Sequence, residues 1–409
     1  MMNKHLIFLL PLFIALSSCD SSTDIISSST VGLEQIYNSG YIDGYNDAKQ
    51  DYSGNKYESG YNDGFADGYN KGLEDGKDQE INASIRPGNN LNIHTDSQAK
   101  YILDDPYNIG KYASGTQEIC LPNVFNLSFE DINFGVDTNQ YIVNLSETED
   151  FSVCEQYITN QKQLNITNLK LNTSYYWNVS IQKDDIKYIS QTFSFSTRND
   201  IIRNICVPGS TNWRDLGNYQ TIDGKTIKQG LIYRSAAFGF SNGTTSNPTQ
   251  EGIDVIKNQL KIKSDIDLTG VNGIDGINRY FYRMEYSNID NLIDDEGNKS
   301  SIKSVFEVLG DENNYPAVFH CTRGRDRTGA VAFLLGGYLG MSKDDLVRDY
   351  LFTNFSSSNT CSSSVINNYF SYMENNFEGA NLKEQIKNYL LSIGVTMDVL
   401  NNITNILVQ

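Results

Sequence analysis

The segment 317–335 constrains the fold of this chain more than any other part of it. A short apolar strand at 317–319 leads into the ten residues HCTRGRDRTG at 320–329, and an apolar helical run follows at 330–335. A tight loop between a buried strand and a helix N-terminus gathers backbone N–H groups and the positive end of the helix dipole at one point. The segment therefore predicts an anion-binding loop inside an α/β domain.

The side chains of this loop indicate its chemistry. The anion of Cys321 would meet the same donors as a bound anion, so we expect a depressed pKa and a nucleophilic thiolate. Arg327 lies six residues later, and its planar guanidinium can contact two phosphate oxygens. Gly324 permits a positive φ and a close approach of the backbone to a ligand. We expect Thr328 to donate its hydroxyl to the thiolate and His320 to orient the loop.

The order His-Cys-x-x-Gly-x-x-Arg-Thr-Gly resembles the Cys-x5-Arg loop of the cysteine-dependent protein tyrosine phosphatases. The resemblance implies that phosphomonoesters are hydrolysed through a cysteinyl-phosphate intermediate. It also implies a group of residues around the phosphate: Thr322, Arg323, Gly324, Arg325 and Thr328. The alternative is a buried cysteine at a strand end near unrelated arginines. The number of matching residue types and the strand–helix context argue against that alternative.

Three blocks upstream sharpen the resemblance. Residues 212–217 read NWRDLG, residues 230–235 read GLIYRS, and residues 265–268 read DIDL. They resemble blocks of the atypical bacterial tyrosine/lipid phosphatases, whose loop carries Lys-Asp-Arg before Thr-Gly. The likeness runs from about residue 212 to the C-terminus. Two positions depart from that pattern, since the Lys of the family is Arg325 here and the Arg after Asp-Leu is Thr269.

The chemistry also needs an acid that protonates the leaving oxygen. Asp326 is the first candidate, by its likeness to the Asp of the family loop. Its alternative role is structural, as a carboxylate that holds Arg214 or another cation. Asp267 and Asp275, at the end of an expected strand and in the loop after it, are further candidates. We expect Arg214 and Asp215 to form a structural pair beside the site.

Three functions fit these features. The first is a protein tyrosine or dual-specificity phosphatase acting on phosphorylated protein. The second is a phosphatase of phosphoinositides or inositol polyphosphates, because Arg323 and Arg325 add positive charge beside Cys321 and favour substrates with several phosphates. The third is a surface lipoprotein that binds a partner and keeps a vestigial loop. The intact Cys321, Arg327 and Thr328 argue against this third function.

Length and patterning divide the chain. With 409 residues, 39% of them apolar, it can form two or three domains. Residues 201–409 alternate strands and helices before helices prevail, which predicts an α/β phosphatase domain with a helical C-terminal half. The expected strands are 231–233, 262–268 and 317–319. The expected helices are 252–260, 300–309, 329–339, 343–353, 363–375, 382–391 and 396–407.

Residues 86–200 show the alternation typical of half-buried strands at 141–145, 175–181 and 192–197, which predicts an all-β sandwich. The runs 169–179 and 192–195 resemble the end of a fibronectin type III domain. This resemblance implies a spacer or binding module rather than chemistry. The net charge of −18 should repel nucleic acid, so we expect no nucleic-acid partner.

The first residues resemble the signal of a bacterial lipoprotein. The apolar run 6–16 is too short to persist as a membrane-spanning helix, and Leu-Ser-Ser precedes Cys19 as in a lipobox. The resemblance implies a signal peptide over 1–18, lipid attached to Cys19, and export to a bacterial envelope membrane, periplasmic or at the cell surface. An ordinary secretory signal is the alternative.

Two further segments precede the sandwich. Residues 19–36 are predicted to be a flexible tether. Residues 37–80 repeat Gly every four residues, which predicts either a helical hairpin or a disordered spacer.

Five cysteines follow Cys19, and an odd number in an exported protein suggests one free thiol. A disulfide between Cys120 and Cys154 is an option that the sequence leaves open. The cysteine spacing fits no zinc site, and we expect neither a metal nor a cofactor.

Overall fold

The structure is a computed structural model that describes residues 25–27, 90–113, 122–129, 140–183, 186–238, 247–270, 273–286, 291–356 and 361–409. These residues form two compact units. The first contains Phe125–Ile166 and Thr173–Ser196 with the described residues before Asn92, and the second contains Asn92–Val124, Thr167–Asn172 and Thr197–Gln409. The predicted lipidation site at Cys19, most of the tether and the glycine repeat lie outside the described residues.

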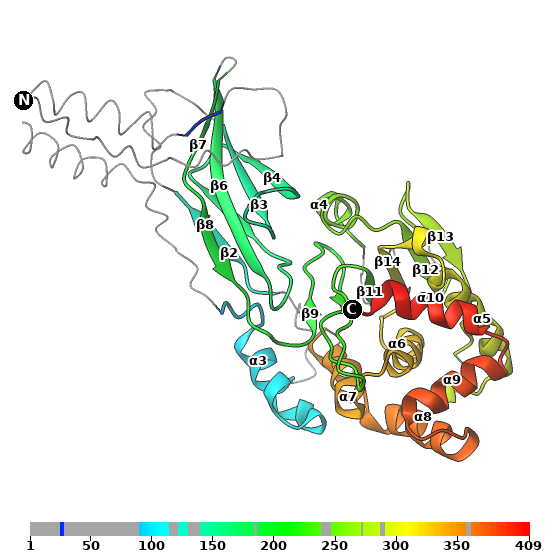
Figure 1. Cartoon of the computed structure of the whole chain (residues 1–409). Coiled ribbons are helices and arrows are strands. Elements are labelled where there is room, and N and C mark those ends of the chain that lie inside the picture. The colour runs from blue at the N-terminus through cyan, green and yellow to red at the C-terminus, as the bar shows by residue number, and fades with distance from the viewer. Residues whose placement is uncertain are drawn as a thin grey trace, which may run out of the picture. The chain divides into compact units, whose positions relative to one another are not determined.

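The first unit is built from strands. One sheet has the order β1-β7-β6-β3-β4, with β8 paired to β6, and a separate pair joins β2 and β5 (Figure 1). The strands are β1 (Ile25–Ser27), β2 (Phe125–Ser128), β3 (Tyr141–Ser146), β4 (Cys154–Thr159), β5 (Gln163–Ile166), β6 (Ser174–Lys183), β7 (Ile186–Ile189) and β8 (Phe193–Ser196). The three strands expected from alternation are thus confirmed as β3, β6 and β8. The fibronectin type III likeness stays a prediction.

One part of the predicted all-β range is helical, and the prediction is wrong there. Residues 96–111 form helix α3 (Asp96–Leu103) and the 3-10 helix η1 (Pro106–Lys111). A capping box between Thr95 and Gln98 starts α3. Its Tyr101 is buried and its ring lies against Phe352 and Phe355, so this segment packs within the second unit. Capping and packing therefore outweigh the strand pattern of the surrounding sequence.

A mixed sheet forms the centre of the second unit. Its order is β13-β12-β14-β11-β10-β9, in which β13, β12, β14 and β11 run parallel and β10 is antiparallel to both its neighbours. The strands are β9 (Arg203–Asn204), β10 (Arg214–Asp215), β11 (Ile232–Ala236), β12 (Ser264–Asp267), β13 (Asn278–Phe281) and β14 (Ala317–Cys321). The three predicted strands correspond to β11, β12 and β14.

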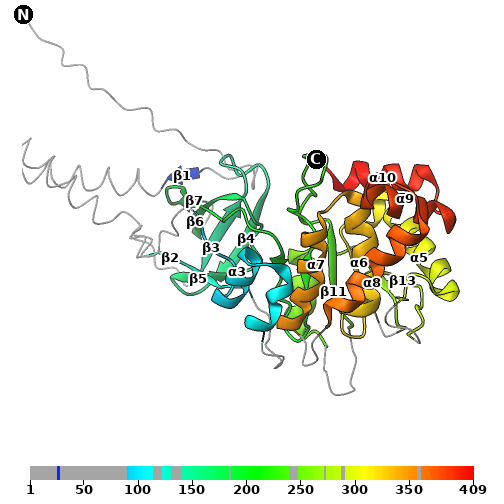
Figure 2. The same cartoon turned by 90° about the horizontal axis from the view of Figure 1, so that it is seen from below.

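Helices complete this unit, and α6 contacts β14, β11, α7 and α9 (Figure 2). The helices are α4 (Gln250–Asp254), the π-helix η2 (Val255–Gln259), α5 (Glu296–Leu309), the 3-10 helix η4 (Glu312–Asn314), α6 (Asp326–Leu339), α7 (Lys343–Phe352), the 3-10 helix η5 (Thr353–Phe355), α8 (Ser363–Asn376), α9 (Leu382–Ser392) and α10 (Met397–Leu407). Every helix predicted for this half is confirmed, except that the first is split into α4 and η2.

The central strand explains why the sequence folds in this way. All five residues of β14 are buried, with Ala317 and Phe319 in one hydrophobic core and Val318 in another. A parallel strand buried on both faces needs a continuous apolar run, and the run at 317–319 supplies it. None of the described helices combines the length and the apolar composition that crossing a membrane would need.

Candidate active site

The predicted nucleophile lies where a parallel strand meets a helix. Strand β14 ends at Cys321, and α6 begins at Asp326. We call residues 321–327 the Cys321 loop. Every residue of α6 except Arg327 is buried, so the helix is fixed by its packing and Arg327 alone reaches out from it. The partial positive charge at the N-terminus of this helix therefore faces a fixed position.

Cys321 is buried, and its pKa lies below the ordinary value for a thiol. Burial opposes this shift, but the charge of Arg327 and then the hydroxyl and backbone N–H of Thr328 beside the thiol outweigh burial. Burial raises the pKa of the other described free thiols, Cys206 and Cys361, and that of Cys361 reaches about 12. Cys321 is thus the described free thiol that is most easily ionised.

Cys154 is disulfide-bonded, and its partner is not among the described residues. The option of a pairing with Cys120 therefore stays open.

Gly324 and Gly329 are required by close contacts around the loop. Gly324 has a φ of +64°, and a Cβ there would lie 2.4 Å from the carbonyl oxygen of Ser235. A Cβ on Gly329 would lie 2.7 Å from the ring of Tyr350. The loop is therefore pressed against the end of β11, and the first turn of α6 that follows it is pressed against α7.

The guanidinium of Arg327 is held by three segments. Its Nη2 donates to Thr322 Oγ1 at 3.0 Å, and its Nη1 donates to the carbonyl oxygens of Leu268 and Met284, both at 3.4 Å. Its central carbon also lies 5.2 Å from the ring centroid of Tyr286. These contacts hold a planar, charged fork close to the nucleophile.

Asp326 belongs to a group that we call the outer cluster: Arg325, Asp326 and Tyr286. Nε of Arg325 donates to both carboxylate oxygens at 3.0 Å, and the Tyr286 hydroxyl donates to Oδ2 at 2.8 Å. Burial would lower the pKa of Arg325, but Asp326 and Tyr286 raise it. The cation that Asp326 holds is therefore Arg325 and not Arg214. Tyr286 was not among the predicted site residues.

Arg323 differs from its neighbour Arg325. It is half-buried, and within the described part of the chain its guanidinium makes no hydrogen bond or ion pair. The two extra arginines of the loop are therefore not equivalent, although the sequence treats them alike. The charge of Arg325 is neutralised locally, whereas the charge of Arg323 is free.

The carboxylate of Asp267, the second candidate acid, accepts several hydrogen bonds. Its carboxylate accepts hydrogen bonds from the backbone and hydroxyl of Thr269 at 2.7 and 2.8 Å and from Arg279 Nη2 at 2.5 Å. Burial opposes ionisation, but His320, Arg279 and Thr269 hold the pKa of Asp267 below its ordinary value. Asp267 therefore orients the turn after β12. Asp275, the third candidate, is exposed and takes no part in these contacts.

His320 fixes the end of β14. Its Nε2 lies 2.8 Å from Asp265 Oδ1, and its ring centroid lies 4.6 Å from that of Phe238. Burial would lower the pKa of His320, but Asp265 and then Asp267 raise it. The side chain is buried, which agrees with the expectation that it orients the loop rather than touching substrate.

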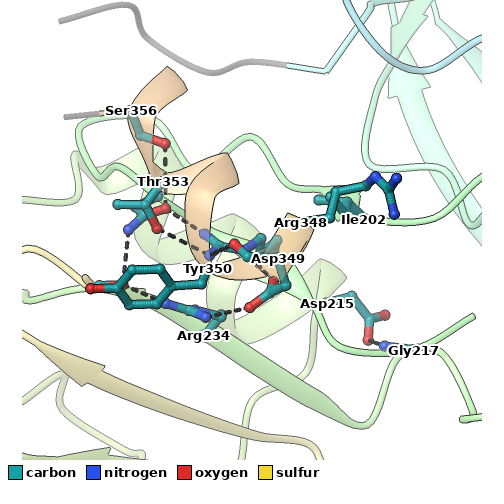
Figure 3. Close-up of polar contacts among 12 residues, drawn as sticks. Ile202, Asp215, Gly217, Arg234, Arg348, Asp349, Tyr350, Thr353 and Ser356 are labelled. Atoms are coloured by element: carbon teal, nitrogen blue, oxygen red, sulfur yellow. Dashed lines mark hydrogen bonds and ion pairs between the residues drawn. The ribbon is translucent and has the colours of Figure 1, made fainter. Parts of the chain in front are cut away.

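A second group of charges is buried behind the loop, and we call it the inner cluster: Arg214, Arg234 and Asp349. Arg214 Nε lies 2.7 Å from Asp349 Oδ1. Arg234 Nη1 contacts Asp349 Oδ2, and Figure 3 shows these two side chains side by side. Burial opposes ionisation of Asp349, but the two arginines hold its pKa below its ordinary value. Burial and the charge of Arg214 lower the pKa of Arg234 to about 10.

The expected pair of Arg214 and Asp215 is not formed. Asp215 instead pairs with Arg203 at 2.8 Å and accepts hydrogen bonds from the backbone of Gly217 and Gly230 at 2.8 and 2.6 Å. Adjacent residues of a strand point to opposite faces, so the two side chains of β10 could not meet. The prediction of a structural role holds for each residue, but with a different partner.

Asp349 was missed because α7 carries several acidic residues. The position of Asp349 on the helix could have identified it. Asp349 lies three residues after the buried Leu346 and one residue before the buried Tyr350, on the apolar face of α7. A carboxylate on an apolar face needs a cationic partner. Arg214 and Arg234 in the upstream blocks could have been proposed as those partners.

The chain matches the model of the Tyrosine phosphatase family over residues 205–290 and 278–409, which together make up half of its 409 residues. The chain belongs to the tyrosine phosphatase family. A tyrosine-protein phosphatase from Cupriavidus necator is 51% identical over 37 residues, 9% of this chain and 14% of the relative. A tyrosine-protein phosphatase from Nostoc commune is 40% identical over 48 residues, 12% of this chain and 16% of the relative. The chain therefore aligns with a small part of the length of these curated relatives.

Two solved structures are also similar. The core catalytic domain of the PP-IP phosphatase SIW14 from S. cerevisiae, in complex with citrate, matches 36% of this chain and 83% of that domain, at 20% identity and a TM-score of 0.27. A structure of the Siw14 catalytic core matches 35% of this chain and 83% of that chain, at 18% identity and a TM-score of 0.26.

Proposed function

We propose that this protein is a cysteine-dependent phosphatase that hydrolyses phosphomonoesters through a cysteinyl-phosphate intermediate. One observation carries the proposal: the thiol of Cys321, with its lowered pKa, ends a parallel strand between the N-terminus of α6 and the guanidinium of Arg327. A phosphate dianion placed there would meet a helix N-terminus, a planar arginine and an ionised nucleophile together.

In the first step the Cys321 thiolate attacks phosphorus, the S–P bond forms and the P–O bond to the leaving group breaks. Asp326, in its protonated form, gives a proton to the departing oxygen. Arg327 compensates the charge on the equatorial oxygens. In the second step water attacks phosphorus, Asp326 takes the proton of that water, and the thiolate leaves with the support of the Thr328 hydroxyl. The products are an alcohol and inorganic phosphate.

This role for Asp326 sets a condition on the outer cluster. Both of its oxygens accept hydrogen bonds from Arg325, and one also accepts from Tyr286. A carboxyl oxygen that carries a proton donates instead of accepting, so one of these contacts must open or reverse when Asp326 holds the proton that it transfers. The Tyr286 side chain is 46% exposed, which leaves that contact free to open.

The proposed substrate is phosphorylated protein, with tyrosine or dual specificity. Both curated relatives carry the name tyrosine-protein phosphatase. The half-exposed ring of Tyr286 lies against the Arg327 guanidinium, where the aromatic ring of a phosphotyrosine could pack against it.

The nucleophile is tested by Cys321→Ser, with Cys206→Ser as the matched loss of another free thiol. Turnover of a phosphotyrosine peptide should vanish in the first variant, which should still bind vanadate, and stay unchanged in the second. Rapid acid quenching with ³²P-labelled substrate should trap a phosphoenzyme at Cys321. Near-normal turnover in Cys321→Ser would overturn the mechanism. A wild-type protein without turnover would restore the vestigial, partner-binding alternative.

A second substrate class, phosphoinositides or inositol polyphosphates, is favoured by the free charge of Arg323. Neutralising Arg323 with Gln should lower kcat/KM for an inositol polyphosphate about tenfold, which is about 1.4 kcal/mol, and affect an aryl phosphate much less. Arg325→Gln should affect both substrates equally, because Arg325 acts on Asp326. Arg283→Gln removes an exposed charge and controls for net charge. Equal losses on both substrates in Arg323→Gln would leave protein as the substrate class.

We also propose that the protein is exported and anchored to a bacterial envelope membrane through lipid on Cys19, with the first unit as a fibronectin type III-like spacer. The lipobox-like residues before Cys19 support the anchor. Growth with radioactive palmitate should label the wild-type protein but not Cys19→Ala. An unlabelled wild-type protein would leave a plain secreted enzyme.

A further inference from the structure

Two carbonyl groups of the Cys321 loop are held from behind. Asn212 Nδ2 donates to the carbonyl oxygens of Arg323 and Gly324, at 3.0 and 2.9 Å, and Arg234 Nη2 donates to that of Gly324 at 2.8 Å. Buried carbonyls require such partners. In a loop whose N–H groups converge on an anion, the carbonyls must turn away from it. The donors behind the loop therefore decide which way its peptide groups face.

Asn212 is itself held in place. Its backbone has a φ of +58°, a left-handed conformation that asparagine tolerates better than most residues. Its Oδ1 accepts hydrogen bonds from Arg214 Nη1 and, at 3.3 Å, from Ser356 Oγ. Arg214 is in turn fixed by Asp349. The amide of Asn212 thus connects the buried inner cluster to the carbonyl groups of the loop.

The arrangement also has an electrostatic side. The inner cluster holds two arginines and one aspartate, all buried, so it leaves a net positive charge behind the loop. Arg234 lies close enough to Cys321 for their charges to interact. The loop therefore has cations on both sides, Arg234 behind and Arg327 in front.

We propose that Asn212 is a positioning residue that keeps the peptide groups of the Cys321 loop turned toward phosphate and thiolate before substrate arrives. This proposal rests on the proposed phosphatase function. Asn212 acts through the loop and touches neither the nucleophile nor the leaving group. Its removal should therefore weaken phosphate binding and thiolate stabilisation together, while the fold persists.

Asn212→Gly tests this proposal, because glycine accepts the positive φ and deletes only the amide. The matched control is Asn218→Gly. Asn218 is also buried, has a φ of +69°, and donates from Nδ2 to the carbonyl oxygen of Asp200 at 2.6 Å, within the same unit. Both variants lose an amide-to-carbonyl hydrogen bond at a left-handed position. They differ in that the carbonyl oxygens that Asn212 contacts belong to the loop, and in that Asn212 Oδ1 also accepts from Arg214 and Ser356, contacts that Asn212→Asp can keep.

The first measurement is alkylation of Cys321 by iodoacetamide against pH, followed by mass spectrometry of its peptide. The half-reaction pH should move upward in Asn212→Gly and not in Asn218→Gly. Inorganic phosphate should protect Cys321 at least tenfold less well in Asn212→Gly, and kcat/KM for p-nitrophenyl phosphate should fall by a similar factor. Asn212→Gly should lose the larger amount of thermal stability, because it also leaves Arg214 Nη1 without its acceptor.

Equal alkylation profiles and equal protection in the two variants would show that Asn212 is merely structural and would overturn the proposal. If Asn212→Gly does not fold, Asn212→Asp serves instead, since aspartate also tolerates this φ and keeps a partner for Arg214, yet cannot donate to the loop. An alkylation profile of Asn212→Asp that matches that of the wild-type protein would also overturn the proposal. Alkylation needs no turnover, so an inactive wild-type protein would refute the proposed function without deciding this inference.

Discussion

The inner and outer clusters combine the same residue types and differ in what their surroundings permit. In the inner cluster the side chains of Arg214, Arg234 and Asp349 are 1%, 0% and 5% exposed. In the outer cluster Arg325 and Asp326 are 11% and 7% exposed, and Tyr286 is 46% exposed. A buried ion pair cannot open without leaving an uncompensated charge, and this holds for the pairs of both clusters. The clusters differ in Tyr286, whose exposed hydroxyl can exchange its contact with Asp326 for water. The inner cluster is thus suited to hold the loop and the outer cluster to exchange a proton.

The largest effect should come from breaking the inner cluster. Asp349→Ala leaves two buried arginines without their carboxylate, so we expect the free energy of unfolding of the second unit to fall by about 3–5 kcal/mol. Urea unfolding followed by Trp213 fluorescence measures this, in a Trp177→Phe background that removes the other tryptophan. Trp213 is buried in the second unit.

The control for this prediction is Asp223→Ala, which breaks an ion pair with Lys383 whose carboxylate side is 54% exposed. A surface pair contributes at most about 1 kcal/mol, so the control should change stability little. Equal losses in the two variants would mean that burial does not distinguish these pairs. The proposed difference between the inner cluster, which holds the loop, and the outer cluster, which exchanges a proton, would then be wrong.

Breaking the outer cluster should affect rate rather than stability. Asp326→Asn removes the proposed acid, so kcat for phenyl phosphate, a poor leaving group, should fall about 100-fold or more. The rate for p-nitrophenyl phosphate should change much less, because its leaving group departs without a proton. Asp275→Asn, at an exposed carboxylate, should leave the ratio of the two rates unchanged. A loss that is equal for both substrates would assign Asp326 a structural role.

The inner cluster should make the stability of the second unit depend on pH in the acid range. The pKa of Asp349 is held below its ordinary value of 3.8. Its contribution to stability is therefore complete above about pH 4 and is lost as the pH falls through the folded-state value. Asp349→Asn should then show a shallower fall of Tm between pH 5 and pH 2, by about 2–4 °C for each kcal/mol removed. An unchanged slope would assign the acid sensitivity to other carboxylates such as Asp267.

The parts predictable from sequence are those encoded by neighbouring residues. The strand, loop and helix from 317 to 339 follow from one apolar run, one motif and another apolar run. The helices of the C-terminal half follow from their periodicity and from caps such as Ser342 and Thr396. Helix α3 was not predicted from the sequence, because a capping box of four residues is a weak local signal and the residues that α3 packs against lie about 250 residues later in the chain.

The inner cluster could not be derived because its members are far apart in sequence. Arg214 and Asp349 are separated by 135 residues, and Arg234 and Asp349 by 115. The blocks NWRDLG and GLIYRS showed that their arginines matter but not which carboxylate they meet. The pairing of Arg325 with Asp326 is local, yet the sequence left the cation that Asp326 holds open between Arg214 and another. The sequence shows that opposite charges are adjacent, and only the geometry shows that one neutralises the other.

The smallest effect should come from the hydroxyl of Tyr286, which joins the outer cluster to solvent. Tyr286→Phe keeps the ring beside Arg327 and removes the hydrogen bond to Asp326 Oδ2. Transfer of the Asp326 proton then no longer requires that this hydrogen bond be opened. A hydrogen bond of about 0.5–1 kcal/mol corresponds to about a twofold to fivefold rise in kcat for phenyl phosphate.

The rate for p-nitrophenyl phosphate should not change in Tyr286→Phe, because no proton is needed there. The same substitution in an Asp326→Asn background should have no effect on either substrate, since the group it acts on is gone. A fall in both rates in the single variant would show instead that the hydroxyl holds the outer cluster in its working position. The outer cluster would then resemble the inner one, as a scaffold whose contacts must stay closed.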